Sequence, residues 1–142
     1  MTLKGAADLD RKLAALGNVA AGKVMRGAMR AAMNEAKKEA EGSVPVGTVT
    51  HRTYRGRLVA PGFAKRNLRV VVVRDKSGAP LRALLGVRRE AFYAVQFLEL
   101  GTSKMPANPW LVPAFERAQP AVTGKLIDGL RERIERAAKG RK

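Results

Sequence analysis

The sequence predicts an α+β fold: one small domain over residues 1–142, in which a mostly antiparallel β-sheet is flanked by a long N-terminal helix and a C-terminal helix. The length of 142 residues is a common size for one domain. Apolar residues with a helical period lie in the first and last thirds of the chain, and two β-type runs separated by a turn lie between them. With 46% apolar and 28% charged residues, the composition is that of a folded protein.

The N-terminal third predicts two helices. Residues 7–16 form a short helical pattern that Gly17 stops, and Asn18 is the expected N-cap of a longer helix that runs to about Glu41. The apolar residues of this longer helix recur at steps of three and four, which places them on one face. They are small or methionine, and such a stripe suits close packing on a sheet or on a neighbouring subunit. The stripe consists of Met25, Ala28, Met29, Ala32, Met33, Ala36 and Ala40.

Residues 42–67 show no convincing period, and prolines, glycines and basic residues punctuate them. A stretch of this length without regular structure is uncommon inside a compact domain. We interpret it as a long basic arm or hairpin that becomes ordered only against a partner, with His51 and Tyr54 as ordinary loop residues. The basic residues expected to face another subunit, a partner protein or DNA are Arg52, Arg55, Arg57, Lys65 and Arg66.

A β-hairpin is predicted over residues 68–88. The continuous β-branched run 68–73 predicts a buried strand, and residues 75–80 have the composition of a turn. The second strand alternates, which places its apolar residues on one face. These residues are Leu81, Ala83, Leu85 and Val87.

The C-terminal third begins with the apolar segment 91–100, followed by a loop over residues 101–109. Asn108 is the expected cap of the last helix and Pro109 its first residue, a position where the missing N–H of proline costs nothing. Pro113 also suits the first turn, and the helix should run to about Ala138 with a kink or break near Gln119, just before Pro120. Its predicted stripe is Leu126, Ile127, Leu130, Ile134 and Ala137, and residues 139–142 are expected to be a frayed basic tail.

Glu99 is the one carboxylate in an apolar segment. A lone charge there is costly unless it is hydrogen-bonded or paired. The turn 101–103 that follows offers backbone N–H groups within reach, so we expect Glu99 to be a structural latch. A catalytic role lacks a partner acid, base or metal ligand in the nearby sequence.

Composition excludes much of enzyme chemistry. The chain has no cysteine and one histidine, which rules out disulfides, thiol nucleophiles and multi-histidine metal sites. No phosphate-binding glycine loop is present. No apolar run reaches the roughly 18 residues of a membrane helix, and residues 1–5 lack the apolar stretch of a signal peptide. We therefore expect no enzymatic activity, no cofactor, no metal and no membrane partner.

The net charge is +16, and it is concentrated in the middle of the chain. Residues 1–50 hold 8 basic and 5 acidic groups, and residues 90–142 hold 9 and 6, so each part has a net charge of +3. Residues 51–89 hold 11 basic groups and 1 acidic group, a net charge of +10. Such a chain is expected to work beside negative charge. A nucleic-acid-binding module is one interpretation, although aromatic residues for base stacking make up only 5% of the chain.

The segment 93–115, YAVQFLELGTSKMPANPWLVPAF, carries a more specific pattern. An aromatic residue is followed by a glutamate, one apolar residue, Gly-Thr, a loop containing proline, and Pro-aromatic-Leu-x-Pro-Ala at the start of a helix. This signature segment resembles that of a family of bacteriophage tail-component proteins, the neck or tail-completion proteins of long-tailed phages. The residues that carry the resemblance are Tyr93, Glu99, Gly101, Thr102, Pro109, Trp110, Pro113 and Ala114.

The order of the predicted elements also agrees with this family over residues 5–138. The resemblance implies a structural virion protein at the head–tail interface, assembled in the host cytoplasm as a ring of six subunits that joins the DNA-filled head to the tail tube. It implies neighbouring head-completion and tail-tube or tail-terminator proteins as partners. Non-specific contact with DNA in the lumen would fit the charge. In this interpretation the signature residues shape a loop and a helix start and are not catalytic. The main alternative is the basic nucleic-acid-binding module.

Overall fold

A computed structural model describes residues 5–47, 49–53, 55–74 and 81–140. It confirms the α+β fold with a long N-terminal helix and a C-terminal helix, although the β-structure forms two separate two-stranded antiparallel sheets, β1–β2 and β3–β4. The elements in chain order are α1 (Ala6–Ala15), α2 (Asn18–Ser43), β1 (His51–Arg52), β2 (Leu58–Val59), α3 (Phe63–Arg66), β3 (Leu68–Val73), β4 (Arg82–Val87), a 3₁₀ turn (Arg89–Ala91), α4 (Phe92–Leu100) and α5 (Leu111–Lys139).

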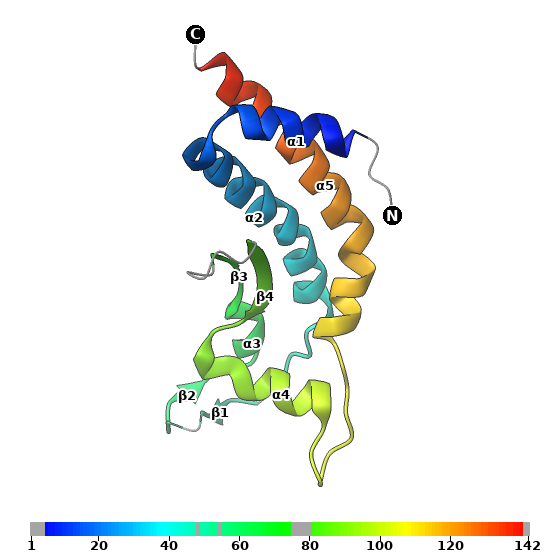
Figure 1. Cartoon of the computed structure of the whole chain (residues 1–142). Coiled ribbons are helices and arrows are strands. Elements are labelled where there is room, and N and C mark those ends of the chain that lie inside the picture. The colour runs from blue at the N-terminus through cyan, green and yellow to red at the C-terminus, as the bar shows by residue number, and fades with distance from the viewer. Residues whose placement is uncertain (1–4, 48, 54, 75–80, 141–142) are drawn as a thin grey trace.

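The long helices α2 and α5 run antiparallel along the molecule, and α1 crosses them at one end (Figure 1). The predicted stripe of α2 forms the seam between them, because its alanines at positions 28, 32, 36 and 40 are at most 1% exposed. Ala36 packs with Ala118 of α5, and a Cβ placed on Gly129 of α5 would lie 3.8 Å from the Cβ of Ala28. Small side chains therefore allow the two backbones to approach closely. Val24 joins the buried set, whereas Met25 and Met29 are half-buried.

Ion pairs connect the exposed edges of the same two helices. Arg117 Nε lies 2.8 Å from Glu39 Oε1, and Lys125 Nζ lies 3.7 Å from Glu35 Oε1. The pKa of Glu35 is lowered from its ordinary value, chiefly by its hydrogen bond with Lys38. Because these groups are exposed to solvent, the pairs add little to stability compared with the apolar seam.

The start of α2 differs from the prediction. Gly17, with φ 80°, is the N-cap, and Asn18 is already the first helical residue with no side-chain cap hydrogen bond at this end. The left-handed φ that ends α1 and turns the chain into α2 is one that glycine adopts without strain. At its other end α2 extends past Glu41 to Ser43.

The hairpin of β3 and β4 packs against α2 (Figure 1). The predicted inward face is confirmed: Ala83 and Leu85 contact the core cluster of Met33, and Leu85 pairs with Val70 across the strands. The prediction of a buried strand over 68–73 is wrong beyond Leu68, because a two-stranded sheet is covered on one face only and the rest of β3 is half-buried or exposed. The predicted turn 75–80 lies outside the described residues.

The segment 42–67 is not an arm that needs a partner for order. It contains the short β1–β2 hairpin and the helix α3, and four of its apolar side chains are buried in the core. The apolar residues between the basic ones anchor the segment to the domain, which the charge pattern alone did not indicate. The buried side chains are Val44, Val59, Phe63 and Ala64.

The last helix is continuous, and the predicted break before Pro120 is wrong. Pro120 lies on the exposed side of α5, where water can satisfy the carbonyl group that lacks its N–H partner. Pro113 is confirmed in the first turn. Lys139, predicted as the first residue of a frayed tail, is instead the last residue of α5, and Gly140 is the C-cap. Residues 141–142 of the predicted tail lie outside the described part of the chain.

Candidate functional site

The signature segment folds as a latched helix–loop–helix made of α4, residues 101–110 and the start of α5. The carboxylate of Glu99, near the end of α4, accepts hydrogen bonds from two backbone N–H groups at the start of α5. Its Oε1 lies 2.6 Å from the nitrogen of Trp110 and 2.5 Å from that of Leu111. These N–H groups have no partner within the helix, and a negative charge at this end also interacts favourably with the helix dipole. We call this contact the Glu99 latch.

The latch confirms the structural role predicted for Glu99 and corrects its partners. The N–H groups of the turn 101–103 were expected, but the side chain crosses the loop to Trp110 and Leu111 instead. Asn108 and Pro109 are therefore not the N-cap and the first residue of the helix, which begins at Leu111 after Trp110. A cap supplied from another helix was not visible in the local sequence.

The loop between the two helices is held by its own backbone. Gly101 has φ 72° and ψ 176°, a region that is essentially restricted to glycine. A Cβ there would lie 2.7 Å from the nitrogen of Ala107. Thr102 and Met105 form a short antiparallel bridge, and the N–H of Asn108 donates to the carbonyl of Leu98 at 2.7 Å.

Beyond the loop, the signature residues anchor the segment in the core. Trp110 is 3% exposed and Ala114 is fully buried, and both pack with Ala40 of α2 and Leu68 of β3. The Trp110 Nε1 group has no hydrogen-bond partner among the described residues. Tyr93 of α4 forms a hydrogen bond through its hydroxyl group with His51 Nε2 of β1, and burial raises the pKa of Tyr93. Tyr93 thereby ties α4 to the β1–β2 hairpin.

A second feature is a cleft of about 710 Å³ between β2, α3 and the ends of β3 and β4. Two of the five predicted basic residues line this cleft, Arg57 and Arg66, whereas Arg52, Arg55 and Lys65 do not. Sequence reasoning missed the other three arginines, which the pairing of β3 with β4 brings close to the first two. We call this site the arginine cleft; its charged lining residues are Arg57, Arg66, Arg69, Arg88, Arg89 and Glu90.

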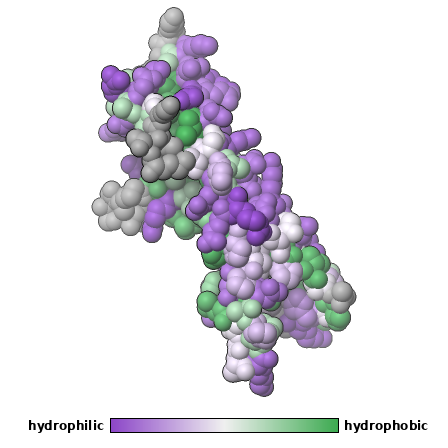
Figure 2. All heavy atoms as spheres, turned by 90° about the vertical axis from the view of Figure 1, so that its right-hand side faces the viewer, coloured by the Kyte–Doolittle hydropathy of each residue, from purple (hydrophilic) through white to green (hydrophobic). Residues whose placement is uncertain are grey.

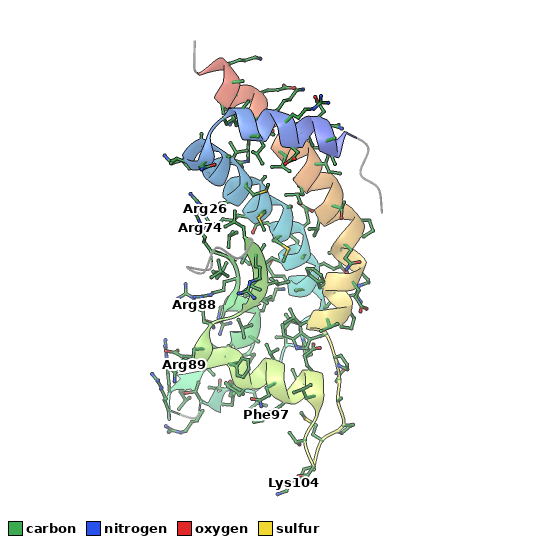
Figure 3. The ribbon with its side chains drawn as sticks, viewed as in Figure 1. Arg26, Arg74, Arg88, Arg89, Phe97 and Lys104 are labelled. Carbon is green, nitrogen blue, oxygen red and sulfur yellow. The ribbon has the colours of Figure 1, made fainter. Side chains whose placement is uncertain are left out.

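The arginines of the cleft fall into two groups. Arg57 lies 3.3 Å from Glu90, and Arg66 donates to the carbonyl groups of Pro61 and Ala60 at 2.7 and 3.1 Å. The other three, Arg69, Arg88 and Arg89, are exposed and have no side-chain partner among the residues that the structure describes. Figure 3 shows Arg88 and Arg89 extending from the same edge of the molecule as Arg74 and Arg26. This edge therefore carries several positively charged side chains.

A third feature is the apolar exposed side of α4, which we call the α4 apolar face. Phe92, Phe97 and Leu100 are 56%, 46% and 76% exposed. Apolar side chains reach the surface in the lower half of the molecule, the end that carries α4 (Figure 2). An exposed apolar patch on a folded domain commonly marks a protein–protein contact.

The described residues hold neither a cluster of metal ligands nor a membrane-spanning helix. Within them, no group of three or more His, Cys, Asp or Glu side chains comes together in a way that could hold a metal ion. In the same part of the chain, no helix combines the length and the apolar character needed to cross a membrane.

Comparison of the chain with protein-family models, with curated proteins and with solved structures finds no match. The resemblance of the signature segment to phage neck proteins is therefore a resemblance of sequence pattern alone.

Proposed function

We propose that this chain is a structural subunit of the phage neck, a tail-completion or head–tail joining protein that assembles as a ring at the head–tail interface of the virion. The signature segment carries the proposal. Its glutamate, glycine and tryptophan shape one loop and one helix start through the Glu99 latch, Gly101 and the buried Trp110. These residues serve the fold, as is expected of a protein with a mechanical role.

The α4 apolar face supports assembly with other subunits. The monomer leaves Phe92, Phe97 and Leu100 in water, and among the described residues no large side chain is less than 2% exposed. A domain with so thin a core gains stability when an apolar face is covered. A ring contact would provide this cover.

The charge supports partners of opposite sign. Six copies at +16 would carry 6 × 16 = +96, a charge that opposes ring closure unless it is neutralised. Acidic surfaces of the neighbouring head-completion and tail-tube or tail-terminator proteins, or DNA in the lumen, would supply the negative charge.

Electron microscopy of a lysate from a phage with a stop codon in this gene tests the proposal. We expect DNA-filled heads beside unattached tails. Tails of normal length would indicate a joining role, and overlong tails a terminator role. Intact, infectious particles would contradict the assignment to the virion.

The arginine cleft is the observation that favours the second candidate, a basic nucleic-acid-binding module that acts outside the virion. The same lysate separates the two functions. A module of this second kind would leave particle assembly unchanged, whereas a neck subunit would leave heads and tails apart.

A further inference from the structure

We propose that the arginine cleft binds the phosphodiester backbone of double-stranded DNA. One part of the inference rests on the proposed function, namely that the duplex is the packaged genome in the lumen of the neck. The binding site itself is argued from the cleft.

The hairpin fixes the positions of the arginines that are free to bind. Arg69 lies on β3, and Arg88 and Arg89 follow β4 directly. Leu68 pairs with Val87, and the N–H of Arg88 donates to the carbonyl of Asn67 at 3.0 Å. Backbone hydrogen bonds between the strands therefore fix the backbone positions of the three arginines at one end of the sheet.

The residue type favours phosphate. All basic side chains of the cleft are arginine, whose planar guanidinium group matches two phosphate oxygens at once. Glu90, the one carboxylate among the described lining residues, pairs with Arg57. Arg69, Arg88 and Arg89 are left with their donors available.

The arrangement favours a long anion over a small one. Arg88 and Arg89 point from the same edge as Arg74, which directly follows β3, and Arg26 of α2 (Figure 3). The row of charge thus continues past the cleft along the molecule. A linear polyanion such as a duplex can contact the whole row, whereas a free phosphate would fill only one part of it.

The other side chains of the cleft disfavour both a single strand and an acidic peptide. Phe63, the one aromatic residue among the described lining residues, is 9% exposed and packed into the core, so its ring is not available for base stacking. Leu58 is the only large apolar side chain of the lining that is exposed, which gives a peptide a poor anchor. Contact with the backbone of a duplex requires neither feature.

Binding of a fluorescein-labelled 20-base-pair duplex to the purified full chain, followed by anisotropy at several salt concentrations, tests the proposal. The cleft variant is Arg69→Gln/Arg88→Gln/Arg89→Gln. The matched control, Arg11→Gln/Arg131→Gln/Lys139→Gln, removes the same charge from exposed residues of α1 and α5. A third variant, with lysine at the three cleft positions, keeps the charge and loses the planar group.

We expect the cleft variant to bind the duplex at least tenfold more weakly than the wild type, and the control within about twofold. The slope of log K against log salt should fall by roughly 0.9 for each phosphate contact that is removed. The lysine variant should retain the salt dependence, and its affinity for the duplex should lie between those of the wild type and the cleft variant. Circular dichroism should show all variants folded, because the substituted side chains are exposed.

Equal losses in the cleft variant and the control would overturn the proposal, since net charge alone would then explain binding. Tighter binding of a single strand, of an acidic peptide or of inorganic phosphate than of the duplex would also overturn it. Such a failure leaves the neck role intact, because that role is judged on heads and tails in the lysate. Conversely, duplex binding would stand even if the lysate held intact particles.

Discussion

Glu99 connects two helices with a single side chain. Its carboxylate, at the end of α4, accepts hydrogen bonds from the start of α5. This contact holds the two ends of the intervening loop together. The glutamate could be predicted as a latch, because a charge in an apolar segment needs hydrogen-bond donors. The donors could not be predicted, because they lie 11 and 12 residues further along the chain. The folding of the loop decides which N–H groups come near the carboxylate.

Replacing Glu99 with alanine should lower the free energy of unfolding by about 2 kcal/mol, because two backbone donors lose a charged acceptor. Glu99→Gln keeps an oxygen acceptor without the charge and should lose about half as much. Chemical denaturation followed by circular dichroism measures both values. Glu116→Ala, at an exposed position of α5, serves as the control and should stay within about 0.5 kcal/mol of the wild type. If Glu99→Ala is as stable as this control, the carboxylate is not a latch.

Two glycines should respond to alanine with opposite signs. Gly101→Ala should destabilise the fold by about 2 kcal/mol or more, because its φ is 72° and the new Cβ meets the backbone of residue 107. Gly124 lies within α5 with nothing within 4 Å of a new Cβ. Gly124→Ala should therefore stabilise the protein by about 0.5–1 kcal/mol through helix propensity. The two thermal unfolding midpoints would contradict this account if they shifted in the same direction.

At the scale of the elements, periodicity was the most reliable guide. The small-residue stripe of α2 and the alternating face of β4 both lie where the sequence places them, because each is set by a period that tertiary structure preserves. Predictions that depend on one residue were less reliable. Asn108 with Pro109 has the form of a helix start, yet Glu99 moves the start to Leu111. Pro120 has the form of a helix break, yet Ala118 before it and Val122 after it both pack in the cluster of Met33 and Ala36 of α2, which keeps the turns on either side in place.

Packing keeps α5 helical around a proline that cannot donate a backbone hydrogen bond, so replacing Pro120 should stabilise the helix. Pro120→Ala restores the missing N–H donor inside α5 and should raise the free energy of unfolding by about 1–3 kcal/mol, partly offset by a more flexible unfolded chain. Urea denaturation measures the difference. Gln119→Ala, an exposed neighbour that already has its N–H, should change little. A loss of stability in Pro120→Ala would show that the proline ring itself supports the helix.

At the scale of the whole molecule, the charged site depends on the fold. The net charge of residues 51–89 predicted a basic surface in the middle of the chain, and Arg57 and Arg66 are part of it. Arg69, Arg88 and Arg89 could not be grouped with them from sequence, because only the pairing of β3 with β4 brings residues 69 and 88 to one end of a sheet. Arg52, Arg55 and Lys65 are also basic but are not part of the cleft lining.

Self-association should depend on the α4 apolar face. In salt high enough to screen the net charge, we expect the wild type to form oligomers in sedimentation equilibrium and Phe97→Glu to remain monomeric. Val19→Glu places the same charge at a different exposed apolar residue, a valine that is 75% exposed near the start of α2, and this variant should associate like the wild type. Association of Phe97→Glu equal to that of the wild type would exclude α4 as the contact between copies.

The alanine seam between α2 and α5 limits how this chain can diverge. Ala28, Ala32, Ala36 and Ala40 sit where a larger side chain would push the helices apart, so glycine is the only smaller residue open to them. The exposed positions of both helices have no such restriction, so their residues can change in evolution. Distant descendants of the same ancestor should therefore keep a row of small residues every fourth position after their remaining sequence has changed beyond alignment. A search for that spacing, ahead of a β-hairpin and a Glu-x-Gly-Thr loop, would find relatives that overall similarity misses.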